Sequence, residues 1–228
     1  MGIAHGGLYV NWSQEKQEVL DACRRIVAAG LVAGSSGNVS RRVVGADGAP
    51  LVAITPTRLP YHRLTVDDIL VIDLEGDPVE GDGVPSSETL VHLAVYRARA
   101  DVGAVIHTHS LYASALSVAG LEIPPIFDEQ VVFLGGPVPV AEYAIAGGQE
   151  LADNACAALG EGNAVLLSNH GVVAVGTDLE EAAGACELVE RLAQVYVFAR
   201  GLGQIRLLPD HAVQAEKKIF RMSRGWLE

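Results

Sequence analysis

Hydrophobic and polar positions follow two different periods along this chain of 228 residues. Over residues 86–99, apolar side chains recur at the spacing of a helix face, which predicts a helix. Residues 39–44 and 51–54 instead have strand-like character on either side of the turn Ala46-Asp47-Gly48, a pattern typical of a β-hairpin. The presence of both periods in one chain predicts a mixed α/β fold.

The same pattern predicts the remaining elements. Ser13 is expected to cap a first helix and Gly30 to end it. The alternation of helices with strands, together with a hairpin, favours a mixed sheet with helices on both faces. We find no repeat, low-complexity stretch or linker, so residues 1–228 are expected to form a single domain. Helices are predicted over 13–29, 111–118, 148–159, 178–199 and from 212; strands over 102–107, 164–167 and 172–175; a helical turn and a strand over 66–73; and loops over 34–38 and 75–83.

Composition narrows the functional classes. The net charge of −12 disfavours nucleic acid, whose phosphates attract basic surfaces. No apolar run approaches the roughly 20 residues that a membrane helix needs. The segment 1–11 lacks a basic region followed by an apolar stretch, which argues against a secretory signal. Three scattered cysteines, Cys23, Cys156 and Cys186, indicate buried thiols in a reducing cytoplasm rather than a disulfide framework.

Two histidines, His107 and His109, stand two residues apart in an otherwise apolar, strand-like segment. Residues two apart on a strand point to the same face, so their rings would lie side by side, about 7 Å apart at Cα. Burying two unpartnered imidazoles is costly, and a divalent cation would satisfy both. Three protein ligands with an open position are typical of catalytic zinc. His170 is the third candidate because a third ligand is needed, although its own surroundings are more typical of a turn than of a ligand.

Glu88, in the segment Pro85-Ser86-Ser87-Glu88, permits two interpretations. A serine before the helix can accept from an N-terminal amide, and a carboxylate in the first turn suits the helix dipole, so Glu88 is a capping residue in the simpler one. In the other, Glu88 is an acid/base beside a metal and removes a proton next to a carbonyl. His92, one turn further, is a fourth ligand or a packing residue, and packing is favoured.

Two further segments have candidate chemistry. The loop Gly34-Ser35-Ser36-Gly37-Asn38, together with Thr55-Pro56-Thr57, offers amides and hydroxyls that can cradle a phosphate. The P-loop pattern is absent, and a plain helix-to-strand turn is the alternative. In Phe127-Asp128-Glu129-Gln130, two acids beside an apolar patch are a second acid/base group or a solvated turn.

Taken together, these segments resemble the class II aldolase/adducin family, and most closely its fuculose-phosphate aldolases. The resemblance covers roughly residues 13 to 200, and the set is far more specific than any single motif. The matching segments are Gly37-Asn38-Val39-Ser40, Ile54-Thr55-Pro56-Thr57, Pro85-Ser86-Ser87-Glu88, His107-Thr108-His109 and Asn169-His170-Gly171.

The resemblance implies a three-layer α/β/α sandwich around a mostly antiparallel sheet, assembled as a homotetramer with sites at subunit interfaces. It implies one Zn²⁺ per chain on His107, His109 and His170, with Mn²⁺, Co²⁺ or Fe²⁺ as alternatives. Glu88 would ligate the zinc at rest and act as the acid/base. The implied reaction is retro-aldol cleavage of a ketose 1-phosphate to dihydroxyacetone phosphate and an aldehyde through a metal-stabilised enediolate. Asn38, Thr57, Ser86 and Ser87 would hold the phosphate.

This chain departs from the family pattern at two places. Fuculose aldolases have glycine after the Thr-Pro-Thr segment, whereas this chain has Arg58. An arginine there would bind phosphate or carboxylate bidentately, or obstruct the pocket. The tyrosine that acts on the aldehyde side belongs near residue 127, where this chain has Phe127-Asp128. Arg58 and Asp128 are therefore candidate substrate contacts, and they leave the substrate open.

Two alternative functions stay open at this point. One keeps the metal and changes the reaction to that of a decarboxylase, a 4-epimerase or a dehydratase acting on a sugar phosphate or a small carboxylic acid. The other is a non-catalytic interaction module, as in the adducin head domain. The presence of all three histidines with Glu88 disfavours the second alternative.

Overall fold

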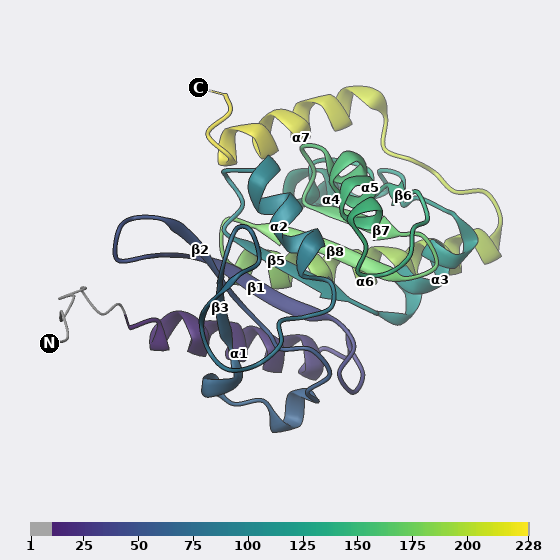
Figure 1. The fold of residues 1–228 in the computed structure, drawn as a ribbon. Helices are drawn as coiled ribbons and strands as arrows, with labels where there is room; N and C mark the ends of the chain where they lie inside the picture. The colour runs from purple at the N-terminus through teal and green to yellow at the C-terminus, as the bar shows by residue number, and fades with distance from the viewer. Residues whose placement is uncertain (1–10, 228) are drawn as a thin grey trace, which may run out of the picture.

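A computed structural model describes residues 11–227, whose strands form one eight-stranded sheet (Figure 1). The strand order is β4-β3-β2-β1-β5-β8-β7-β6. Neighbouring strands are antiparallel except β6 and β7, which are parallel. The predicted mixed, mostly antiparallel sheet is therefore confirmed. The strands are β1 (Asn38–Val44), β2 (Pro50–Ile54), β3 (Leu70–Asp73), β4 (Pro78–Glu80), β5 (Ala104–Thr108), β6 (Val140–Ala141), β7 (Ala164–Leu167) and β8 (Gly171–Gly176).

Helices cover both faces of this sheet and make the predicted α/β/α sandwich (Figure 1). Because strand side chains alternate between faces, neighbouring residues of β5 enter different cores. Ile106 packs with α1, α3 and α6, whereas Val105 packs with α2 and α5. The helices are α1 (Ser13–Ala28), α2 (Thr89–Ala98), α3 (Leu111–Ala119), α4 (Asp128–Leu134), α5 (Gln149–Leu159), α6 (Leu179–Leu202) and α7 (Asp210–Ser223), with 3-10 turns at Tyr61–Arg63 and Val66–Asp68.

Most predicted elements are present, with shifted ends. The hairpin of β1 and β2 is confirmed. Ser13 lies inside α1 rather than capping it, and its amide donates to the side chain of Asn11. The interval 75–83 is not only a loop, since it contains the short edge strand β4. Helix α4 and strand β6 were also not predicted, because each is short and depends on packing against distant segments.

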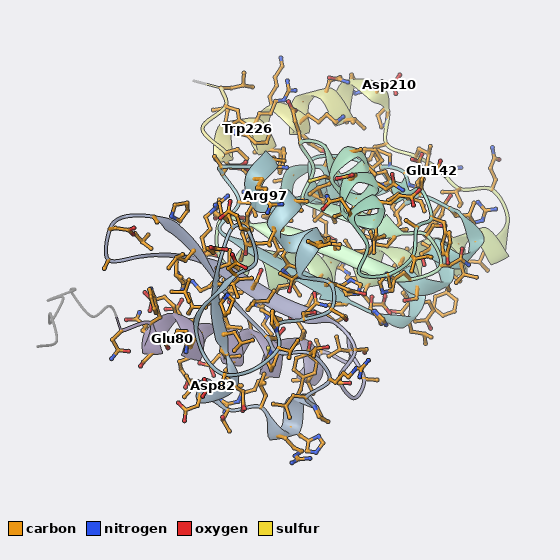
Figure 2. The ribbon with its side chains drawn as sticks, in the orientation of Figure 1. Glu80, Asp82, Arg97, Glu142, Asp210 and Trp226 are labelled. Carbon is orange, nitrogen blue, oxygen red and sulfur yellow. The ribbon has the colours of Figure 1, made fainter. Side chains whose placement is uncertain are left out.

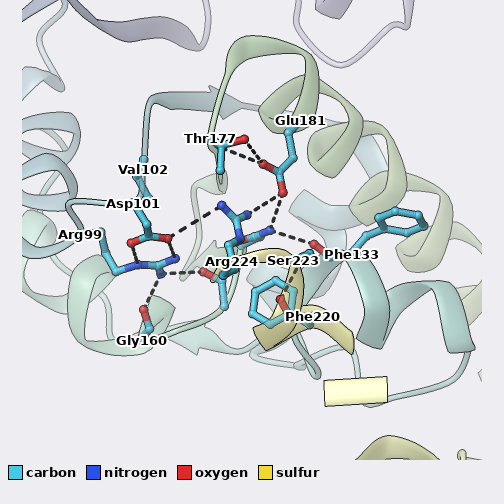
Figure 3. Close-up of polar contacts among 12 residues, drawn as sticks. Arg99, Asp101, Val102, Phe133, Gly160, Thr177, Glu181, Phe220, Ser223 and Arg224 are labelled. Atoms are coloured by element: carbon cyan, nitrogen blue, oxygen red, sulfur yellow. Dashed lines mark hydrogen bonds and ion pairs between the residues drawn. The ribbon is translucent and has the colours of Figure 1, made fainter. Parts of the chain in front are cut away.

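The C-terminal helix α7 lies over α4 at one edge of the molecule, with Asp210 at its start and Trp226 beyond its end (Figures 1 and 2). Its end is anchored by Arg224, whose side chain is 1% exposed and donates to Glu181 at 2.6 Å (Figure 3). Asp101 lies 3.8 Å from the same guanidinium. A buried arginine needs such partners, so this cluster ties the C-terminal segment to α6 and to the turn before β5.

Three further expectations meet the structure in different ways. The three cysteines are free. Cys23 and Cys186 are buried as predicted, which raises the pKa of their thiols, whereas Cys156 is only partly buried. None of the described helices is long and apolar enough to cross a membrane. The argument against a secretory signal rests on residues 1–11. Of these, only Asn11 is among the described residues.

Candidate metal centre and substrate pocket

Four predicted site residues converge at one end of the sheet. The Nε2 atoms of His107 and His109 are 2.8 Å apart. Glu88 spans the group: its Oε2 lies 3.0 Å from His107 Nε2 and its Oε1 lies 2.9 Å from His170 Nε2. The ligand atoms of the three histidines all lie within 4.8 Å of one another. Three imidazole nitrogens, with the Glu88 carboxylate beside them, therefore lie close enough together to hold one metal ion.

Strand pairing explains why His170 lies beside the other two histidines. Thr108, at the end of β5, pairs with Val172 of β8, so the turn between β7 and β8 lies next to His107 and His109. A Cβ on Gly171 would lie only 2.3 Å from the Thr108 carbonyl oxygen and 3.1 Å from the His109 ring. Only glycine at position 171 allows the turn to come this close.

Hydrogen bonding and burial prepare His107 to act as a ligand. Its Nδ1–H donates to the Val172 carbonyl oxygen at 2.8 Å, which leaves the lone pair of Nε2 directed at the cluster. Burial lowers the pKa of His107 to about 4, although the charge of Glu88 opposes this shift. Burial, with the charge of His170, also lowers the pKa of His109. Both rings are therefore neutral near pH 7, as metal binding requires.

The carboxylate of Glu88 is held in its ionised form. Burial favours its neutral form, but a hydrogen bond from His170, the charge of His107 and a hydrogen bond from Asn38 outweigh it. Together they hold the pKa of Glu88 below its usual range. Glu88 occupies the N-cap position of α2, yet its side chain makes no capping hydrogen bond. The capping interpretation is therefore wrong, because the carboxylate points to the histidines instead of the helix amides.

Three loops enclose a polar hollow of about 180 Å³ beside the histidines. The backbone joins two of these loops, since Thr57 N donates to Val84 O at 2.9 Å and Ser86 N donates to Thr55 O at 3.1 Å. The third loop approaches β5 at Gly37, where an added Cβ would lie 2.5 Å from the His107 carbonyl oxygen. The hollow is lined by Ser35, Ser36, Gly37, Asn38, Pro56, Thr57, Arg58, Ser86, Ser87, Glu88 and His109.

The lining of this hollow includes every residue predicted to hold a phosphate. It is rich in amides and hydroxyls, and Arg58 is its only lysine or arginine. A larger hollow between α1 and α6 is lined by acidic side chains and Arg25, and it contains none of the predicted site residues. The hollow beside the histidines therefore suits a small anionic substrate, because its donors match an anion and its volume is small.

Arg58 has an unusual backbone conformation, with a φ of +60°. This left-handed region favours glycine and is uncommon for a residue with a long side chain. The side chain is exposed at the edge of the hollow. Such conformations cost free energy and cluster at binding sites, so the backbone of Arg58 is consistent with a role in ligand binding.

The structure does not bring Asp128 into this hollow. Asp128 begins α4 and is exposed, and neither it nor Phe127 lines the hollow of the described chain. The sequence left open whether this segment is an acid/base group or a solvated turn. The structure shows the start of helix α4 there, not a turn. A contact of Asp128 with substrate therefore stays a prediction, and it requires a second chain.

Sequence reasoning missed the hydrogen bonds of His92. The residue is fully buried on α2, as the packing interpretation expected, but both of its ring nitrogens are within hydrogen-bond distance of polar side chains. Nδ1 lies 2.6 Å from Ser40 Oγ, and Nε2 lies 2.5 Å from Asn38 Oδ1. In the sequence, only the spacing of four residues between Glu88 and His92 indicated that the two side chains are neighbours. Because both ring nitrogens have polar partners, neither is free to bind a metal.

Comparisons with known proteins agree with this geometry. Residues 17–197 match the family model described as the class II aldolase and adducin N-terminal domain. The 5-deoxy-D-ribulose 1-phosphate aldolase of Bacillus thuringiensis serovar kurstaki is 34% identical, over 91% of this chain and 95% of its own length. The L-fuculose phosphate aldolase of Escherichia coli K12 is 38% identical, over 90% and 93%. A solved L-fuculose 1-phosphate aldolase superposes with a TM-score of 0.87 at 34% identity, covering 95% of this chain and all of that one.

Proposed function

The chain belongs to the class II aldolase and adducin family, and on that premise we propose that it is a zinc-dependent lyase that cleaves a ketose 1-phosphate. The products are dihydroxyacetone phosphate and an aldehyde. The observation that carries the proposal is the position of Glu88, which touches the three-histidine cluster and lines the polar hollow. Relatives named as aldolases of fuculose and deoxyribulose phosphates support the substrate class.

The residues present fit a divalent metal. His107, His109 and His170 supply three imidazole nitrogens, and the bond from His107 Nδ1 to a backbone carbonyl is the outer contact that metal-binding histidines usually make. Zn²⁺ suits this donor set best, with Mn²⁺, Co²⁺ and Fe²⁺ as alternatives. When bound, the metal would supply Lewis acidity toward the carbonyl of the substrate.

Glu88 would move the proton on the carbon where the bond breaks. In the cleavage direction, the aldehyde-side hydroxyl gives its proton to the ionised carboxylate of Glu88, and the carbon–carbon bond breaks to release the aldehyde. The electron pair stays on the carbon next to the carbonyl, and Glu88 returns a proton to that carbon. Its contact with the histidines and its place on the wall of the hollow suit both a resting metal contact and this role. Asn38, Thr57, Ser86 and Ser87 would hold the phosphate through amide and hydroxyl donors.

The direct test is an assay of the zinc-loaded protein on a panel of ketose 1-phosphates. Formation of dihydroxyacetone phosphate and an aldehyde in equal amounts is the expected result. Release of carbon dioxide from an acid without an aldehyde would select the decarboxylase instead, and epimerisation or loss of water would select the other two reactions. If the protein binds no metal and acts on none of these substrates, the result would support an interaction module.

Arg58 gives a prediction about substrate affinity. R58G is expected to raise KM for a phosphorylated ketose about tenfold, because a charge-assisted hydrogen bond at the pocket edge is lost. The variant should lose no thermal stability, because glycine adopts a φ of +60° without steric cost. Steady-state kinetics and thermal melts measure the two quantities.

The matched variants for Arg58 are R58K, which keeps the charge, and R63Q, which removes an exposed arginine outside the hollow. R58K should recover much of the affinity, and R63Q should not change KM. An R58G variant with wild-type KM, or with a lower KM, would contradict the predicted contact and favour the obstructing role.

We also propose that the protein is a homotetramer and that residues 1–228 form one domain. Exposed apolar side chains on α3 and α6, including Leu111, Val118, Phe198 and Leu202, support association, since such groups mark interfaces. Light scattering should give the mass of four chains of 23.9 kDa, and the mass of one chain would contradict this. The three free thiols support a reducing cytoplasm, which cell fractionation would test.

A further inference from the structure

A continuous line of buried side chains connects the interior of the sheet with Glu88. Tyr96 Oη lies 2.8 Å from Ser40 Oγ, which lies 2.6 Å from His92 Nδ1. His92 Nε2 lies 2.5 Å from Asn38 Oδ1, and Asn38 Nδ2 donates to Glu88 Oε2 at 3.2 Å. Each of the first four side chains is at most 4% exposed. We refer to Tyr96, Ser40, His92 and Asn38 as the buried relay.

The geometry of two elements produces this relay. Asn38 and Ser40 stand two apart on β1, so their side chains point to the same face of the sheet. His92 comes from α2, which covers that face, and its ring bridges the two side chains. Glu88 stands one turn before His92 at the start of the same helix. The buried relay therefore connects Glu88, at the start of α2, with strand β1.

Only one order of donors satisfies every contact in the relay. A carboxylate only accepts, so Asn38 must turn its NH₂ group toward Glu88 and its oxygen toward His92. That oxygen needs a donor, so His92 has its proton on Nε2. Burial lowers the pKa of His92 to about 3, so the ring is neutral and Nδ1 accepts. Ser40 therefore donates to His92 and accepts from Tyr96.

We propose that His92 is a positioning residue, which acts through Asn38 to tie the acid/base Glu88 to the phosphate end of the pocket. The proposal rests on the proposed function. With Asn38 Oδ1 held by His92, one amide hydrogen binds Glu88 and the other is available to an anion in the hollow that Asn38 lines. A flipped amide would present its oxygen to both anions and repel them. His92 therefore orients a group that contacts both the acid/base Glu88 and the anion in the hollow.

The test compares two replacements of His92 in the zinc-loaded protein. H92L removes the donor and fills the space with an apolar group, whereas the amide of glutamine in H92Q can still donate to Asn38 near the position of Nε2. H92L is expected to lower kcat about tenfold and to weaken binding of inorganic phosphate about tenfold. H92Q should stay within about threefold of the wild type. Calorimetry on the zinc-loaded and metal-free proteins measures phosphate binding and separates the pocket from direct binding to the metal.

The matched control is V95A, which removes a buried side chain of the same helix that contacts no member of the relay through a hydrogen bond. It should destabilise the protein without changing phosphate affinity. A folded H92L variant with wild-type kcat and phosphate affinity would show that His92 only packs. If V95A weakened phosphate binding as much as H92L does, the conclusion would likewise be that His92 only packs.

A measurement on the unmodified protein keeps the proposal testable if H92L fails to fold. Nitrogen-15 NMR of the imidazole should show a neutral ring protonated on Nε2 at neutral pH, in the presence and absence of zinc. Protonation on Nδ1 would overturn the donor order and with it the proposal. This readout does not depend on the reaction, so a wild-type protein without aldolase activity would contradict the proposed function and leave the test of His92 intact.

Discussion

Replacing Glu88 with glutamine is expected to lower kcat for retro-aldol cleavage by about 10²- to 10⁴-fold, the range that general acid–base catalysis contributes. Glutamine has nearly the same shape, and its oxygen can accept from Asn38, but it cannot transfer the proton. KM should change little, because the phosphate contacts are untouched. Steady-state kinetics with detection of released dihydroxyacetone phosphate measures both constants.

Metal content must be measured with this variant, because Glu88 also contacts His107 and His170. The three histidines should retain zinc at one ion per chain in E88Q. An E75Q variant, which changes an exposed glutamate in the turn before β4, is the charge-matched control and should behave as the wild type. E88Q with full zinc and wild-type kcat would rule out the acid/base role, whereas loss of zinc together with activity would limit Glu88 to a ligand.

Removing the metal should have an equally large effect. H170A is expected to bind much less than one zinc per chain and to lose activity by about 10³-fold or more, since Lewis-acid stabilisation contributes several kcal/mol. A chelator should inactivate the wild type to a similar level, and added zinc should restore it. Zinc at 1,000 times its Kd should also stabilise the folded wild type by about 4 kcal/mol, because only the native state assembles the donors. Metal analysis, kinetics and thermal melts measure these effects.

The control for H170A is H62A, which removes an exposed histidine outside the cluster. It should retain zinc, activity and the zinc-dependent rise in melting temperature. His170 is a better choice for replacement than His107, because the His107 ring is buried in β5 and its loss would disturb the core. A full zinc complement in H170A, with zinc-dependent activity, would contradict the three-histidine site.

The fold was predictable where the pattern of hydrophobic residues is local and strong. The hairpin of β1 and β2 and the long helix α6 follow from such patterns. Strand β4 was missed because its three residues lie at the edge of the sheet and show no alternation of buried and exposed positions, and they extend only because Val71 of β3 pairs with Glu80. Helix α4 was missed because a helix of seven residues is marginal alone and depends on packing, here against α7.

The candidate site divides in the same way. The spacing of His107 and His109 indicated that two imidazoles share a face, and the structure places their Nε2 atoms 2.8 Å apart. The approach of His170 and Glu88 depends on strand pairing and on the position of α2, which no local pattern reports. The contact between Asn38 and His92 joins segments 54 residues apart, which no local pattern reports either.

The sequence by itself determined the chemical types at the site, the alternation of elements and, through the combined motifs, the family. These properties depend on residue identity and on short-range periodicity. Only the tertiary structure decided whether Glu88 caps a helix or contacts the histidines, and whether His92 only packs or also contacts Asn38. Both residues have local alternatives of similar merit, because a carboxylate suits a helix start and an imidazole suits a core. The partners that decide between the alternatives lie on other strands, so only the folded chain supplies them.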